Sequence, residues 1–283
     1  MESRTVGRYE LTDERWSRIE GLFPPNGRRG GQWRDHRTVV NGVFWVLCSG
    51  APWRDLPGRY GAWQTAHGRL PPVAAGRHLG AGPAVAPGVG RRPRAGRLGP
   101  VERRHDVGAG DPARGRGPQK KGADTDEPAD HGLGRSRGGF GSEPHVVTDG
   151  RGDVLQGVLT KGNRNEIPVL GPLLAAALRA NPGRRPRRLA ADKGYSADRV
   201  RDGLVAAGIA PVIPMRANEH PDDRDRWGPF DAAAYKGRNV VERAVAKLKE
   251  FRRVATRYEK LSSAYLAMLT VANIVLYMRL LDS

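Results

Sequence analysis

Apolar residues recur at helical spacing near the N-terminus and predict a set of short helices. Thr12 can cap the first helix, and two prolines end its apolar stripe. Asp35 can cap a second helix, and Gly50 follows its last apolar turn. A third helix is expected from Ala62-Trp63. The pattern predicts a small all-α domain with five tryptophans in its core. Such a domain is compatible with a helix-turn-helix DNA binder, but the helical pattern alone supports DNA binding only weakly.

Strands and helices alternate in the C-terminal half. Short apolar runs at 145–148 and 153–160 flank an Asp-Gly turn signal and predict a β-hairpin. The elements expected after it are a helix at 167–180, a strand at 188–191, a helix at 197–207, a strand at 211–214, and helices at about 237–256 and 262–281. This order predicts an α/β fold.

The most apolar segment lies near the C-terminus, at 264–281. Thr270, Asn273 and Arg279 interrupt it, so we predict a buried helix and no membrane partner. The N-terminus lacks the apolar stretch of a signal peptide, and a single cysteine allows no internal disulfide. We therefore expect a cytoplasmic protein.

Residues 71–120 differ in composition from both flanks. They contain 8 Ala, 11 Gly, 8 Pro and 9 Arg, with too few large apolar residues to offset the entropy of ordering. The sequence therefore predicts three regions. These are a helical DNA-binding domain at 1–70, an aberrant and disordered segment at 71–120, and an α/β domain at 121–283.

The net charge favours a polyanionic partner. The chain has 48 Lys+Arg against 30 Asp+Glu, a formal net charge of +18. Such a balance is typical of nucleic-acid binding, while a merely solvated basic surface is the alternative. Residues 71–120 hold 10 Lys+Arg and 3 Asp+Glu, so a net charge of +11 remains outside that segment.

Asp192 is the first candidate for chemistry. It follows a short apolar strand and precedes Lys193-Gly194-Tyr195. Sites in α/β sheets tend to form at the carboxyl ends of strands. A structural role as a helix-capping or turn aspartate explains the same position equally well. Neither a P-loop motif nor H-E-x-x-H is present in the sequence.

Four polar residues form the second candidate, on the helix expected near residue 240. At about 100° per residue, Tyr235, Arg238, Glu242 and Lys249 fall on one narrow stripe beside an apolar face. An ordinary ion pair between Arg238 and Glu242 is the simpler explanation, but this order of charges is the weaker one. A carboxylate among cations also suits a site that holds a metal ion and phosphate together.

A family resemblance becomes specific at these residues. The spacing Tyr235-x2-Arg238-x3-Glu242-x6-Lys249 resembles the Y-x2-R-x3-E-x6-K signature of DDE transposases of bacterial insertion sequences. The block around Asp192 resembles that of the family's second catalytic aspartate. Tyr9–Trp63 resembles the N-terminal helical domain of one large group of these enzymes.

The resemblance implies an RNase H-like catalytic domain and in-line phosphoryl transfer on double-stranded DNA. The DNA would comprise the terminal inverted repeats of the element and a target. Asp192 and Glu242 would be catalytic and would hold two Mg²⁺ ions. Tyr235, Arg238, Lys249 and Lys193 would contact DNA. The resemblance also implies a homodimer.

The family's first catalytic aspartate has no convincing counterpart. It should end the first strand of the fold, inside 71–120, where Asp106 is a poor candidate because Arg103–Gly108 makes a poor buried strand. The sequence therefore predicts an incomplete RNase H-like domain that lacks its first strand and first aspartate, and an enzyme of uncertain activity.

A frameshift in the gene would explain this segment. Codons for Gly, Ala, Pro and Arg are rich in G and C, so an out-of-frame reading of GC-rich DNA produces these residues in excess. Reading Val101–Asp106 one nucleotide later can give Trp-Ser-Val-Asp-Thr, which resembles the family's first-aspartate block. Leu70–Gly80, shifted likewise, can give a helix-like run resembling the family's next segment. We hypothesise one frameshift near residue 70 and a compensating one near 115–119.

Two functions follow from this reading. The first is an insertion-sequence transposase, impaired by the loss of its first aspartate. The alternative is a non-catalytic DNA-binding remnant that acts as a repressor of the parent element.

Overall fold

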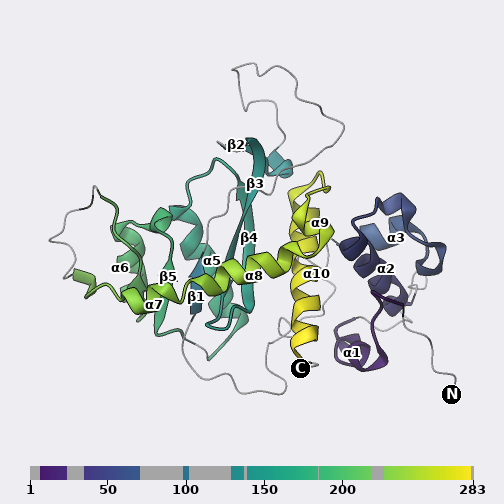
Figure 1. Cartoon of the computed structure of the whole chain (residues 1–283), viewed down its shortest axis with the longest axis horizontal. Helices are drawn as coiled ribbons and strands as arrows, with labels where there is room; N and C mark the ends of the chain where they lie inside the picture. The colour runs from purple at the N-terminus through teal and green to yellow at the C-terminus, as the bar shows by residue number, and fades with distance from the viewer. Residues whose placement is uncertain are drawn as a thin grey trace, which may run out of the picture. The chain divides into compact units, whose positions relative to one another are not determined.

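The computed structural model describes residues 7–23, 35–70, 98–101, 129–136, 139–183, 185–217, 219 and 226–281 (Figure 1). The chain divides into two compact units. One unit, called here the helical unit, comprises Met1–Val85 and Leu248–Ser283. The other, called the α/β unit, comprises Ala86–Lys247.

The helical unit begins with the two capped helices that the sequence predicts. The Thr12 hydroxyl caps α1 (Asp13–Ser17) by accepting a hydrogen bond from the Arg15 amide. The Asp35 carboxylate accepts one from the Thr38 amide at 2.8 Å and so starts α2 (His36–Ser49). Helix α2 ends at a glycine with φ of 75°, a conformation that costs glycine little.

Shorter turns complete the N-terminal part of this unit. They are the 3-10 helices η1 (Glu20–Leu22), η2 (Trp53–Asp55) and η3 (Gly58–Tyr60), and the short α-helix α3 (Trp63–Gly68). Helix α3 begins where the sequence predicts the third helix, which confirms that prediction.

The predicted helix at 237–256 is broken in two. Helix α8 spans Asn239–Lys249, and α9 spans Arg252–Ala255. Phe251 between them has an extended backbone, which interrupts the helix, and its side chain is buried. Helix α10 (Ser262–Leu281) then forms as predicted.

The last residues of the chain, from Leu248 onward, belong to the helical unit. The physical reason is that α9 and α10 pack against α2 and against each other. The Tyr265 hydroxyl, for example, donates to the Val254 carbonyl at 2.9 Å. Helix α10 is long and apolar enough to cross a membrane, but half of its Ser262–Leu280 window is buried within the structure, as in a core helix.

The α/β unit contains a parallel and an antiparallel set of strands. In the parallel set the order is β1 (Leu98–Val101), β5 (Arg188–Ala191) and β6 (Ala210–Val212). In the antiparallel set the order is β2 (Gly134–Ser136), β3 (Gly139–Thr148) and β4 (Val154–Lys161). Strands β1 and β3 are neighbours, so the two sets adjoin there.

Strand β1 forms where the amino-acid pattern predicts no convincing strand. It lies inside segment 71–120 and pairs in parallel with β5, with an irregular register between Leu98 and Val101. The expectation of no strand rested on the few large apolar side chains of this segment. Strand pairing, however, uses the backbone N–H and C=O groups, which nearly every residue has. Pro100, which has no N–H to donate, falls within the irregular part.

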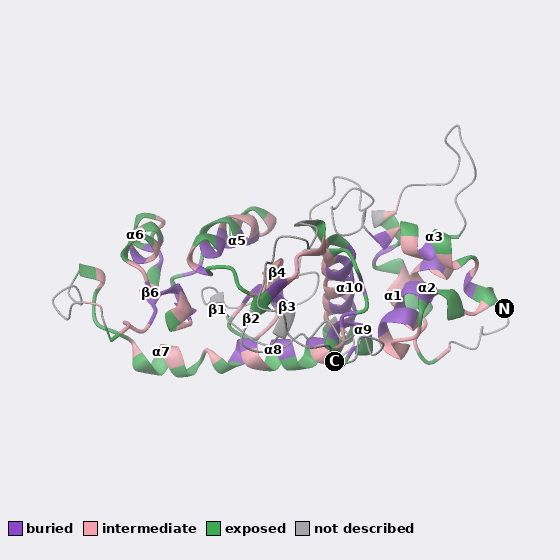
Figure 2. Ribbon diagram, turned by 90° about the horizontal axis from the view of Figure 1, so that it is seen from above, coloured by how far each residue is buried: buried purple, intermediate pink, exposed green. Residues whose placement is uncertain are grey.

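Helices cover both sides of the strands (Figure 2). Helices α5 (Ile167–Ala180) and α6 (Asp198–Ala206) lie on one side, and α7 (Ala232–Lys236) and α8 on the other. The first side carries the main apolar core of the unit. Its buried residues are Val147, Leu170, Leu173, Leu174, Ala177, Leu189, Ala191, Tyr195, Leu204, Ile209 and Ile213.

Candidate active site

Asp192 lies directly after β5, at the carboxyl end of the strand. Its carboxylate caps the short turn η6 (Lys193–Tyr195), accepting a hydrogen bond from the Gly194 amide at 3.2 Å. The capping role that the sequence left open is therefore present. The capping hydrogen bond uses one oxygen of the carboxylate, and the Asp192 side chain is partly exposed.

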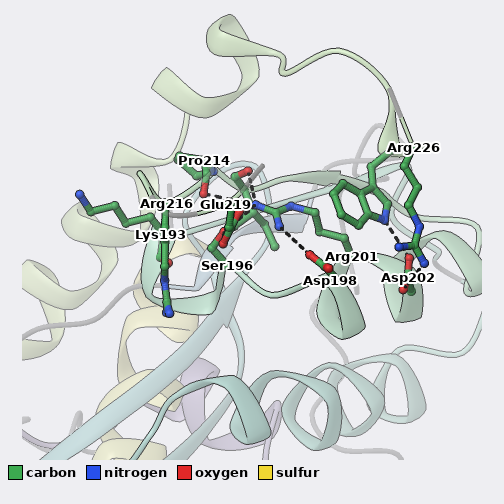
Figure 3. A network of polar contacts seen from close by, with 11 residues as sticks. Lys193, Ser196, Asp198, Arg201, Asp202, Pro214, Arg216, Glu219 and Arg226 are labelled. Carbon is green, nitrogen blue, oxygen red and sulfur yellow. Dashed lines mark hydrogen bonds and ion pairs between the residues drawn. The ribbon is translucent and has the colours of Figure 1, made fainter. Parts of the chain in front are cut away.

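An arginine fixes the backbone of this turn from outside (Figure 3). The Arg216 Nε donates to the Lys193 carbonyl at 3.1 Å, and its Nη2 donates to the Gly194 carbonyl at 2.7 Å. The buried carboxylate of Glu166 fills the place that a side chain at position 194 would need. Neither Arg216 nor Glu166 was found by the sequence analysis, because their contacts cross gaps of more than 20 residues.

A buried arginine secures the residue after the turn. Arg201 on α6 is 3% exposed, and its guanidinium contacts the Ser196 hydroxyl and the Glu219 carboxylate (Figure 3). The Ser196 hydroxyl also donates to Glu219 at 2.6 Å. A charge this deeply buried is stable only when paired and hydrogen-bonded, so the network holds η6 against α6.

A second buried network lies under the turn. The Tyr195 hydroxyl and the His145 Nδ1 are 2.6 Å apart, and both residues are fully buried. The other ring nitrogen of His145 lies 2.9 Å from the Thr160 hydroxyl on β4. The turn that carries Asp192 is therefore tied to the hairpin β3–β4 as well as to α6.

Tyr235, Arg238 and Glu242 meet at the junction of α7 and α8. Tyr235 is on α7, Arg238 lies in the connecting turn, and Glu242 is in the first part of α8. The single continuous helix assumed for these residues is therefore interrupted. The grouping survives, since the Arg238 Nη2 donates to the Glu242 carboxylate at 2.7 Å and its guanidinium lies 5.5 Å from the Tyr235 ring centre.

The electrostatics of Tyr235 connect this group with Asp192. Burial raises the pKa of the Tyr235 hydroxyl, the Arg238 charge opposes that rise, and the charges of Asp192 and Glu242 add to it. Independently of this effect, α7, which carries Tyr235, packs against β5, the strand that Asp192 follows. The fold thus brings the helix that carries Tyr235 against the strand that leads into Asp192, although the two are far apart in the sequence.

The other predicted site residues are Lys193, Lys249 and Asp106. Lys193 is exposed beside Asp192. Lys249 ends α8 and belongs to the helical unit. Asp106 lies outside the described residues. Within the described part of the chain, no three His, Cys, Asp or Glu side chains are grouped so that they could hold a metal ion.

The chain matches two protein families. Residues 11–75 match the family described as "Putative transposase of IS4/5 family". Residues 110–278, more than half of the chain, match the family described as "Transposase DDE domain". Residues 76–109 lie outside both matched ranges.

Two similar proteins are named for insertion sequences. A "Putative transposase for insertion sequence element IS402" of Burkholderia cepacia is 38% identical over 134 residues, which cover 46% of this chain and 59% of that protein. A "Putative transposase for insertion sequence element IS6501" of Brucella ovis is 27% identical over 135 residues, 48% of this chain and 96% of that protein. No solved structure matches the chain.

Proposed function

The chain belongs to the DDE transposase family, and from this premise we propose that it binds the ends of an insertion sequence through a site built for DNA strand cleavage and transfer. The observation that carries the proposal is that α7, which carries Tyr235 of the Tyr235–Arg238–Glu242 group, packs against β5, the strand that Asp192 follows. Two carboxylates from separate elements, flanked by Arg238, suit phosphoryl transfer on a polyanion.

The donor chemistry of this site fits the divalent metal that the family uses. Mg²⁺ prefers carboxylate and phosphate oxygens, and Asp192 and Glu242 provide two carboxylates. These two residues would hold the metal, which supplies charge neutralisation at the reacting phosphate and acidifies bound water. The described residues provide two of the three expected carboxylates.

The other residues of the site position these carboxylates and the DNA. The Arg238 guanidinium holds Glu242 in place and keeps a positive charge beside the reacting phosphate. Arg216 and the capped turn η6 hold Asp192 at the end of β5. Lys193 and Lys249 would neutralise phosphates next to the cut end, in keeping with the family signature.

The strand arrangement supports an RNase H-like catalytic domain. An antiparallel hairpin, β3–β4, adjoins the parallel strands β1, β5 and β6, and helices cover both sides. Strand β1 is central in this arrangement, between β3 and β5. We propose that it occupies the place of the first strand of the fold, without the aspartate that this strand should carry.

A frameshifted gene explains why that aspartate is missing. The two family matches end at residue 75 and resume at residue 110, and the gap lies within the segment of aberrant composition. We propose that the chain is a transposase whose catalytic site is incomplete and whose cleavage is therefore impaired. If the shifted reading frame across 71–118 contains stop codons in the coding DNA, this explanation is wrong.

Restoring the reading frame tests the function directly. The variant replaces residues 71–118 by the translation of the shifted frame, and both chains are incubated with Mg²⁺ and a duplex carrying the inverted repeats of the parent element. We expect both chains to bind the duplex and only the restored chain to cut it. Equal cleavage by the original chain would overturn the proposed impairment.

Glu242→Gln in the restored chain tests the site itself. Cleavage should fall by more than about 100-fold, because even outer-shell partners of a metal site cost 10- to 100-fold. Glu250→Gln is the matched control, since Glu250 is an exposed carboxylate just beyond the end of α8. Unchanged cleavage by Glu242→Gln would remove this residue from the catalytic set.

Binding without cleavage is the second candidate function. It needs only attraction to DNA, which the formal net charge of +18 provides. The original chain would then occupy the element ends and repress the parent transposase. We propose a homodimer in the cytoplasm for either function, to be tested by sedimentation of the chain with and without DNA.

A further inference from the structure

Phe230 is a large apolar side chain left exposed beside the candidate active site. Its ring is 49% exposed on the segment that leads into α7. Single exposed apolar residues are common on protein surfaces and need no explanation by themselves. Two further observations, the anchoring of its segment and the neighbours of its ring, set Phe230 apart.

The segment is anchored on the N-terminal side at Trp227. The Trp227 indole N–H donates to the Asp202 carboxylate at 2.8 Å. Its ring lies 5.0 Å from the guanidinium of Arg201 and 5.2 Å from that of Arg226. Arg226 also pairs with Asp202, so this stretch is attached to α6 by several contacts (Figure 3).

The segment is anchored on the C-terminal side at Asp231. Its carboxylate caps α7 by accepting from the Ala234 amide at 2.8 Å. It also pairs with Arg188 on β5 at 2.5 Å. With Trp227 and Asp231 both attached to the α/β unit, the fold holds the Phe230 ring outward instead of leaving it on a loose loop.

The ring of Phe230 contacts the candidate active site. Its centre lies 5.5 Å from that of Tyr235, at an interplanar angle of 54°. The Tyr235 ring contacts the Arg238 guanidinium, which in turn donates a hydrogen bond to the Glu242 carboxylate. An exposed aromatic surface therefore continues outward from the place where a phosphate would react.

We propose that Phe230 stacks on an unpaired nucleobase of the DNA strand whose phosphate is held at this site. The inference rests on the proposed function and deepens it by specifying a single-stranded or frayed DNA end as the bound form. Aromatic side chains stack on bases of any sequence, while basic groups beside them hold the backbone. Arg238 and the exposed Lys236 supply those charges here. In a closed duplex the faces of a base are covered by its neighbours, so the contact requires an unpaired end.

The test compares single-stranded and duplex DNA on the full chain. The probe is an oligonucleotide carrying the fluorescent base 2-aminopurine, used alone and annealed to its complement, without Mg²⁺ so that no strand is cut. For Phe230→Ala we expect about tenfold weaker binding of the single strand, loss of the quenching of 2-aminopurine, and little change for the duplex. Phe230→Trp should keep both affinity and quenching.

Val205→Ala is the matched control. Val205 on α6 is also 49% exposed in the same unit, but it is not aromatic and has no ring contact. It should leave both affinities unchanged. Equal losses for single strand and duplex, or none for Phe230→Ala, would overturn the stacking role while leaving DNA binding intact. Failure of the unmodified chain to bind either DNA would overturn the proposed function, and this inference with it.

Discussion

Gly152→Ala is expected to disturb the packing of the hairpin β3–β4 against α8. Gly152 lies in the turn of this hairpin with φ of 92°, where L side chains are strained. A Cβ added there would lie 2.9 Å from the carbonyl oxygen of Val240 on α8. Val240 comes two residues before Glu242, so the substitution acts on the helix that carries this carboxylate.

A second glycine separates the loss in free energy of unfolding into backbone strain and overpacking. Gly183 has a similar φ of 80° but no atom within 4 Å of an added Cβ. Gly183→Ala should therefore cost only the backbone strain, about 1–2 kcal/mol. Gly152→Ala adds overpacking against a backbone atom, typically about 1–3 kcal/mol more.

Urea unfolding of the full chain, followed by circular dichroism, measures both losses. Hydrogen exchange of the α8 amides gives the local effect, and it should increase for Gly152→Ala alone. If the two variants lose the same stability within about 0.5 kcal/mol, or if α8 exchanges equally in both, the close approach of the hairpin to α8 is refuted.

Three further predictions concern buried or partly buried polar groups. Tyr195→Phe removes the hydrogen bond to the buried His145 and should cost about 1–3 kcal/mol in urea unfolding. Arg201→Met leaves a carboxylate without its buried cation and should cost about 3 kcal/mol, whereas Arg199→Met at an exposed position of α6 should change stability by less than about 0.5 kcal/mol. Burial and a neighbouring arginine lower the pKa of His67, so the helical unit should lose stability as the pH falls below about 6.5. In His67→Gln this loss between pH 7 and pH 5 should be reduced, and an unchanged pH profile would contradict the assignment to His67.

The elements of the fold followed from local signals in the sequence. Thr12 and Asp35 cap the helices that they were expected to cap, and Gly50 ends α2 with a positive φ. The hairpin at β3–β4 and helix α5 also form where the apolar pattern predicts them. Capping and periodicity are properties of neighbouring residues, so they can be seen without knowledge of the fold.

The candidate site could be predicted only as two separate parts. Asp192 was identified by its place after a strand, and Glu242 by its spacing from Arg238. No local pattern could show that α7, which carries Tyr235, packs against the strand that Asp192 follows, since this contact forms only when separate elements fold together. Arg216 and Glu166, which hold the turn after β5, gave no sequence signal for the same reason.

The sequence by itself determined the chemistry available to this protein: the basic charge, the two carboxylates with their cationic neighbours, and the aberrant composition of 71–120. The tertiary structure decided which of these groups meet. It formed a strand within 71–120, because β5 offered backbone partners whatever the side chains. It also placed the C-terminal helices against α2, because helices bury their apolar sides by packing against one another. Such packing can join helices that are far apart in the sequence, so no local pattern reveals it.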